Sequence, residues 1–146
     1  METGQTPFIH RHVIGWGECD PAGIIYTPRV IDFVVEVIEA WYPAALGITW
    51  TEMRQSRNTG VPMVRAKCDF IKAPVPDLEL FVEVRVAAIG RSSITFTVTG
   101  RDGAGDDYFR ARMVSCYTDL TDVSAKEIDS DLRERMVAYQ TSCNDS

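Results

Sequence analysis

The chain has 146 residues, 45% of them hydrophobic, and a formal net charge of −6, which is the size and composition of one ordinary globular domain. Its acidic surface repels phosphates, so it argues against a protein that binds nucleic acid through many backbone contacts. No apolar run approaches the roughly 20 residues that cross a bilayer, and the longest is interrupted by Asp32, Glu36 and Glu39. We therefore expect no nucleic-acid partner and no membrane association.

The cysteines point to a reducing compartment. Cys19, Cys68, Cys116 and Cys143 are scattered without a C-x-x-C pair, and no basic and then apolar leader opens the sequence. The cysteine pattern therefore indicates neither a disulfide-linked fold nor a zinc site. We expect the protein to be located in the cytoplasm. Because no repeat, low-complexity tract or linker interrupts the chain, residues 1–146 are expected to form a single domain.

A strand, a loop and a long helix are predicted first along the chain. Residues 8–16 are rich in β-branched and aromatic side chains, which predicts a strand, and an unusual loop follows at 18–26. Apolar residues then recur at helical spacing from Pro28 to about Leu46, with Thr27 as the expected N-cap. Because this helix is apolar around most of its circumference, we expect other elements to enclose it.

Period-2 alternation of apolar and polar residues then marks further strands. They cover residues 64–70, 78–86, 93–99 and 108–118. Turn-forming residues at 89–92 and 102–105 join neighbouring strands, which favours an antiparallel meander. A short C-terminal helix is expected after Lys126. One long helix wrapped by a five-stranded antiparallel sheet is an α+β architecture.

The loop before the long helix reads Gly17-Glu18-Cys19-Asp20-Pro21-Ala22-Gly23-Ile24-Ile25-Tyr26. It resembles the G-D-C-D-P-A-G-I-V signature of the 4-hydroxybenzoyl-CoA thioesterase-like family, a branch of the hotdog-fold superfamily, and departs from it at Glu18 and Ile25. Weaker similarities follow in the family's order at 60–62, 70–74 and 90–93. The resemblance implies a hotdog fold, in which a sheet wraps a long helix, and hydrolysis of an acyl-CoA thioester without a metal or other cofactor.

The resemblance also implies roles for individual residues. The family's catalytic carboxylate corresponds to Asp20, which would act as nucleophile or general base on the thioester. Thr27 lies just before the helix proline, and its backbone N–H would stabilise the negative charge that develops on the carbonyl oxygen. Substrate binding is implied for Gly23, Tyr26, Arg91 and Ser92. Of these, Arg91 and Ser92 would hold the nucleotide end of CoA.

Other interpretations of the same residue types stay open. Asp-Pro-Ala-Gly alone is also a common turn or cap sequence, which gives Asp20 a purely structural alternative. Glu36 and Glu39 could be the helix glutamate of other hotdog thioesterases, but they lie on a stripe typical of a solvated helix face. His10 and His12 are interpreted as polar strand positions rather than as catalytic bases.

The resemblance also bears on assembly and specificity. Hotdog domains pair through exposed sheet edges, so a homodimer or homotetramer with sites between chains is expected. The alternative function is noncatalytic binding of an acyl thioester or another small ligand on the same fold. Specificity for a hydroxybenzoyl group is not carried over, because Val34, Val35 and Ile38 offer no polar group to recognise a hydroxyl. CoA and an acyl carrier protein both stay open as the thiol carrier.

Overall fold

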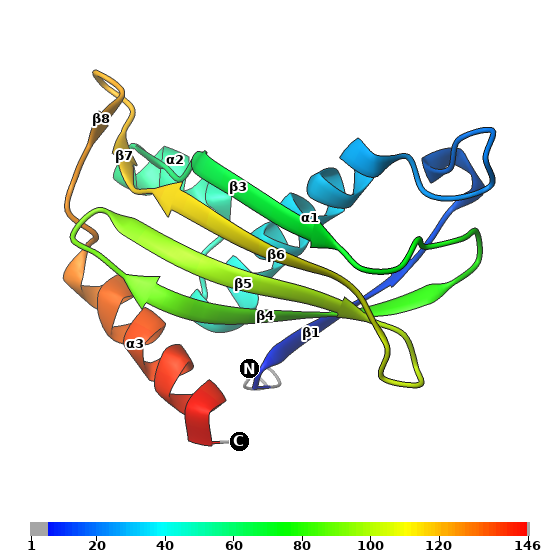
Figure 1. The fold of residues 1–146 in the computed structure, drawn as a ribbon. Coiled ribbons are helices and arrows are strands. Elements are labelled where there is room, and N and C mark those ends of the chain that lie inside the picture. Colours follow the sequence, from blue (N-terminus) through cyan, green and yellow to red (C-terminus); the bar gives the residue numbers. More distant parts are fainter. Residues whose placement is uncertain (1–5, 146) are drawn as a thin grey trace.

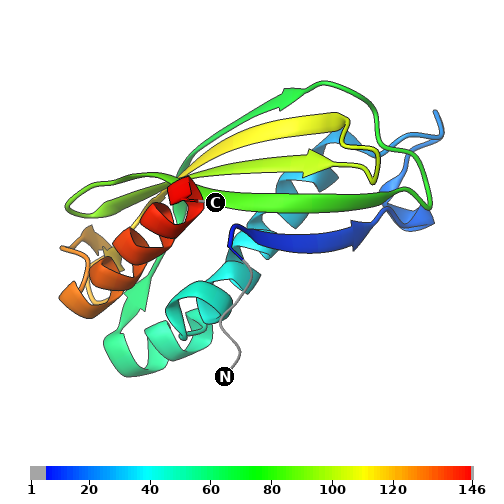
Figure 2. The ribbon, with the colours of Figure 1, turned by 90° about the horizontal axis from the view of Figure 1, so that it is seen from below.

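The structure, a computed structural model, describes residues 6–145. The long helix α1 (Thr27–Trp41) lies along one face of a curved five-stranded antiparallel sheet (Figure 1 and Figure 2). The strands in spatial order are β1 (Phe8–Val13), β4 (Glu79–Ile89), β5 (Ser93–Arg101), β6 (Asp107–Cys116) and β3 (Met63–Phe70). The predicted α+β architecture, the five strands and the meander from β4 to β6 are confirmed.

The hydrophobic core lies between α1 and the inner face of the sheet. The strands contribute alternate residues, because successive side chains point to opposite faces. In β4, for example, Leu80, Val82 and Val84 are fully buried. The helix contributes Val30, Phe33, Val34, Val37, Ile38 and Trp41. Glu36 and Glu39 are exposed on α1, which confirms the predicted solvated stripe.

The first strand and the start of the helix differ from the predicted boundaries. β1 ends at Val13, and Trp16–Glu18 form a separate 3-10 turn, η1. Thr27 is the first residue inside α1, and Tyr26 is the N-cap without a side-chain hydrogen bond. The prediction of Thr27 as the cap is therefore wrong by one position. A proline is tolerated throughout the first turn, where backbone N–H groups have no helical partner, so Pro28 does not fix the boundary.

The long helix changes character before it ends. After Trp41 it widens into a π-helical turn, η2 (Tyr42–Leu46), and stops at Gly47, whose φ of 70° is left-handed. The predicted end at Leu46 is confirmed, but the last turn is not α-helical. Pro43 lies inside this turn and has no N–H to continue the α-helical hydrogen-bond ladder.

Two parts of the fold were not predicted. The first is a helix, α2 (Trp50–Arg57), which starts with a capping box between Thr49 and Glu52. That motif is readable from the sequence and could have predicted the helix start. The second is a small sheet made of β2 (Thr59–Gly60), β7 (Thr118–Asp119) and β8 (Ser124–Ala125). Strands this short show no alternation, so periodicity cannot find them.

The C-terminal helix α3 (Ser130–Asp145) is longer than predicted and covers part of one sheet edge (Figure 1). β1 pairs with β4 only as far as Val84. Beyond it, Gln140 donates to the carbonyls of Val86 and Ala87, so α3 satisfies groups that a bare edge would expose. At the opposite edge, no strand among residues 6–145 pairs with the outer side of β3. No helix of the described residues is long and apolar enough to cross a membrane.

Candidate active site

The loop that joins β1 to α1 folds back on itself at one end of the sheet (Figure 1). The N–H of Tyr26 donates to the carbonyl of Glu18 at 2.8 Å, and the N–H of Asp20 donates to the carbonyl of Ile24 at 3.0 Å. The N–H of Gly23 closes a tight turn on the carbonyl of Asp20 at 2.9 Å. Gly23 has a φ of 80°, which would strain most other residues. Backbone hydrogen bonds therefore define the shape of this loop.

Asp20 is half-buried at the first position of that turn. Its Oδ1 accepts the N–H of Ala22 at 2.9 Å, so the turn-forming role considered for this residue is real. No hydrogen bond among residues 6–145 engages Oδ2. The carboxylate borders a cavity of about 250 Å³. The other residues around this cavity are Trp16, Cys19, Pro21, Gly23 and Pro76.

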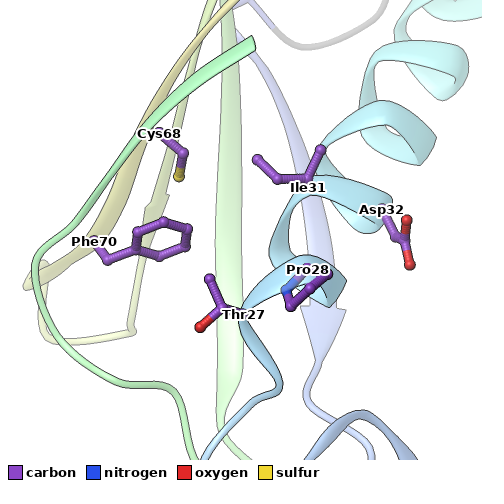
Figure 3. A pocket seen from close by; sticks show the side chains of 6 residues that line it. All are labelled: Thr27, Pro28, Ile31, Asp32, Cys68 and Phe70. Atoms are coloured by element: carbon purple, nitrogen blue, oxygen red, sulfur yellow. The ribbon is translucent and has the colours of Figure 1, made fainter.

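A larger groove of about 510 Å³ lies between the first turns of α1 and the edge strand β3. Its lining residues are Thr27, Pro28, Ile31, Asp32, Cys68 and Phe70. In Figure 3 the side chains of the strand face those of the helix across the gap, and Asp32 points away. Burial and the neighbouring Asp69 raise the pKa of Cys68 to about 11, so its thiol stays neutral. The walls of the groove therefore suit an apolar ligand.

The start of α1 gives the groove an electropositive end. Thr27 is the first helical residue, so its backbone N–H has no acceptor within the helix, and the helix dipole favours negative charge there. Tyr26 is 56% exposed, and its carbonyl accepts the N–H of Arg29 at 2.8 Å. The loop that contains Asp20 leads directly into α1, so this loop and the start of the helix lie at the same end of the sheet (Figure 1). Asp20 and Thr27 nevertheless line different cavities.

Arg91 and Ser92 lie far from this loop. They form the turn between β4 and β5, at the opposite end of the sheet (Figure 1). β4 has 11 residues, and at roughly 3.3 Å per residue it spans about 36 Å. The exposed guanidinium of Arg91 has its one ion pair within the described residues with Glu127, at 4.0 Å. Within one chain, the structure does not bring these two residues together with Asp20.

A histidine that was interpreted only as a strand position contacts the loop. Nε2 of His12 lies 3.1 Å from both carboxylate oxygens of Glu18. The pKa of the nearby His10 is lowered by partial burial and by the charge of His12, against an opposing effect of Glu36. The sequence held a signal for this placement. His12 lies two residues before the buried Ile14 in the segment predicted as a strand, and alternation along a strand would place both on its inner face.

The two helix glutamates lie away from Asp20, and the thiol beside Asp20 is not reactive. Glu36 and Glu39 are exposed along α1 and do not line either of the two cavities. Cys19 does border the Asp20 cavity. Desolvation and then the carboxylates of Glu18 and Asp20 raise the pKa of its thiol, which keeps it protonated and unreactive near neutral pH.

Comparisons with known proteins identify the family and the fold. The family model of the thioesterase-like superfamily matches residues 14–136. A search of curated proteins finds no match. Among solved structures, a thioesterase superfamily protein from Jannaschia sp. CCS1 is 27% identical with a TM-score of 0.84, and the match covers 94% of this chain and 96% of that one.

More distant structures share the fold. A 1,4-dihydroxy-2-naphthoyl-CoA thioesterase from Synechocystis is 14% identical with a TM-score of 0.82, over 89% of this chain and 95% of that one. A Staphylococcus aureus protein solved in complex with CoA is 8% identical with a TM-score of 0.87, over 97% of this chain and 88% of that one. At such low identities these two matches establish a common fold and nothing finer.

Proposed function

Because the chain belongs to the thioesterase-like superfamily, we propose that it hydrolyses an acyl-CoA thioester with Asp20 as the catalytic carboxylate. One observation carries the assignment. The carboxylate of Asp20 is held in the loop through Oδ1 and leaves Oδ2 without a hydrogen bond among the described residues, at the rim of a cavity. A carboxylate that is positioned by one oxygen and available through the other can serve as base or nucleophile.

Two routes fit this carboxylate. As a nucleophile, Oδ2 of Asp20 attacks the thioester carbon, the C–S bond breaks, CoA leaves as a thiolate, and water hydrolyses the mixed anhydride. As a general base, Oδ2 takes a proton from water, whose oxygen attacks the same carbon; the C–S bond then breaks, and CoA leaves as a thiolate that takes up the proton. In both routes the carbonyl oxygen becomes negative, and the unengaged N–H of Thr27 at the helix start would stabilise it. We propose that Gly23 and Tyr26 contact the thioester between these two groups.

The acyl chain fits the groove between α1 and β3. Its apolar walls would bury a hydrocarbon chain, and burial is worth about 0.8 kcal/mol for each CH₂ group. The Synechocystis enzyme is named for an aromatic acyl group. Among the residues that line the groove here, only Thr27 and Asp32 are polar, and Asp32 points away from the gap (Figure 3). The groove therefore shows no set of polar side chains that would select an aromatic acyl group with hydroxyl substituents. We also propose that the chain belongs to the 4-hydroxybenzoyl-CoA thioesterase-like branch of the superfamily.

We further propose that two chains pair through β3. This strand leaves one side open and carries exposed apolar residues, with Val64 at 63% and Phe70 at 51% exposure. Antiparallel pairing of two β3 strands would place the partner's Arg91 turn at the same end as this chain's Asp20 loop. Arg91 and Ser92 would then bind the phosphates of a CoA whose thioester lies at the other chain's Asp20. A homodimer, or a homotetramer built from it, follows.

The cytoplasm is the proposed location. The four cysteines are scattered along the sequence without a C-x-x-C pair, and this fits a reducing compartment. CoA thioesters are the proposed substrate in that setting. The Staphylococcus aureus protein of the same fold was solved with CoA, which supports the choice of carrier.

A panel of acyl-CoAs assayed for free thiol tests the proposal, with Asp20→Asn and Glu36→Gln as a matched pair. Asparagine keeps the acceptor that Ala22 uses but loses the charge, so kcat should fall by about 10²–10⁴ while the protein stays folded. Glu36 is exposed on the helix, and its substitution should cost less than about tenfold. Full activity of Asp20→Asn would reject the assignment. Binding of acyl-CoA by the wild type without turnover would favour the noncatalytic alternative.

A further inference from the structure

His12 makes a nearly enclosed contact with the Asp20 loop from the inner face of β1. Its ring stacks on Phe33 of α1, with ring centroids 4.3 Å apart and ring planes inclined by 21°. Nε2 lies 3.1 Å from each carboxylate oxygen of Glu18. Only 19% of the His12 side chain and 22% of the Glu18 side chain are exposed. A charge-assisted hydrogen bond in such surroundings is stronger and better ordered than a surface ion pair.

The chemistry of the pair determines which group donates. An ionised carboxylate has acceptors only, so Nε2 of His12 carries the hydrogen and donates it to Glu18. In the neutral ring this selects the tautomer with the hydrogen on Nε2, and an imidazolium donates through the same nitrogen. The nitrogen that faces the loop is therefore occupied by Glu18 and does not take a proton from a substrate or a water.

Glu18 is the point at which both ends of the loop meet. Its Oε1 accepts the N–H of Gly15 at 2.8 Å, which holds the turn before the loop. Its carbonyl accepts the N–H of Tyr26 at 2.8 Å, and Tyr26 directly precedes Thr27. Asp20 follows Glu18 by two residues. A shift of Glu18 would therefore move the proposed catalytic carboxylate and the proposed oxyanion donor together.

We infer that His12 is a positioning residue: its hydrogen bond to Glu18 keeps Asp20 and Thr27 in fixed positions relative to the sheet. The inference rests on the proposed function and extends it to a residue that does not touch the substrate. Small displacements matter at such sites, since a misplacement of about 1 Å can cost about 10² in rate. Stacking on Phe33 fixes the orientation of the His12 ring. The hydrogen bond from this ring then restrains Glu18 and, with it, the loop.

Two substitutions separate the hydrogen bond from the packing. His12→Phe keeps a ring on Phe33 but removes the donor, whereas His12→Gln keeps an N–H donor near the position of Nε2. We expect His12→Phe to lower kcat by about 10- to 100-fold with KM changed less than about threefold, and His12→Gln to retain most of kcat. His10→Gln, on the same face of β1, is the control and should leave kcat unchanged, because no hydrogen bond among the described residues joins His10 to the loop.

The coupling to Glu18 can be measured directly. If His12 acts through Glu18, then His12→Phe should reduce kcat much less in a Glu18→Gln background than in the wild type. Equal reductions in both backgrounds would overturn the inference. So would a fully active His12→Phe, or a His12→Gln that loses as much activity as His12→Phe although both melt at the wild-type temperature.

Hydrogen exchange provides a readout that does not need activity. The amides of Asp20, Gly23 and Tyr26 are hydrogen-bonded within the loop, and they should exchange faster in His12→Phe than in the wild type or in His12→Gln. If the wild type hydrolyses no acyl-CoA, the proposed function fails, and exchange still decides whether His12 orders the loop. Unchanged exchange of these amides in His12→Phe would contradict the positioning role.

Discussion

Replacing Gly100 with alanine should destabilise the protein, because the ring of Phe109 occupies the place of a β-carbon. The two residues are register partners on β5 and β6. An ideal Cβ at Gly100 would lie 2.7 Å from Cζ and 2.8 Å from Cδ1 of Phe109, and closer still to Cε1. Phe109 is 1% exposed and packs edge to face on Phe33, with ring centroids 5.5 Å apart. The ring therefore has no open space into which it can move.

The expected size of the effect follows from these contacts. Overpacking of a dense core costs about 1–3 kcal/mol, and a clash with several atoms of a buried ring belongs in the upper part of that range. Alanine also has less conformational freedom than glycine in the unfolded chain, and this offsets about 0.4–1 kcal/mol of the destabilisation. We expect a net loss of about 2 kcal/mol. For a chain of this length it corresponds to a fall in Tm of about 4–8 °C.

Urea unfolding followed by tryptophan fluorescence measures this loss. The midpoint should fall with the m value unchanged. Gly103→Ala, in the turn of the same hairpin, is the matched control. Its Cβ would meet only Phe81, at 3.9 Å, and its stability should change by less than about 0.5 kcal/mol. In a Phe109→Leu background, Gly100→Ala should be less destabilising than in the wild type. An equal cost in both backgrounds, or no cost in the wild type, would refute the packing argument.

Three further predictions concern the nucleotide site, the assembly and a charged network. Arg91→Ala should raise KM for acyl-CoA several-fold with little change in kcat, and an unchanged KM would place the nucleotide site elsewhere. The protein should sediment as a dimer or tetramer at micromolar concentration, and a fully active monomer would exclude the paired-edge arrangement. The hydrogen bond from Arg57 lowers the pKa of Asp131 from 3.8 to about 2, so the folded state favours the carboxylate. The stability advantage of the wild type over Asp131→Asn should hold above about pH 4 and disappear as the pH falls towards 2 in urea titrations, whereas a constant difference across this range would argue against the pair.

The candidate site was predictable where its residues are neighbours in sequence. Gly23 takes a left-handed conformation and Asp20 closes the turn before it, both of which the Asp-Pro-Ala-Gly motif encodes locally. His12 could not be assigned to the site in that way. Its partner Glu18 is reached only because β1 and the loop fold against α1. The position of Arg91, at the far end of the sheet from Asp20, also depends on how the strands are ordered.

The elements that could be predicted are those that depend on residues close together in the chain. Alternation in β4 and β5 and helical spacing in α1 set which side chains face the core, because backbone geometry fixes the direction of each side chain. The order of the strands in the sheet, in contrast, depends on how distant parts of the chain pack. β3 follows α2 in the chain yet pairs with β6 at the sheet edge, and this pairing leaves Phe70 exposed and opens the groove beside α1. Contacts between residues far apart in sequence depend on how whole elements pack, which no short window of the sequence contains.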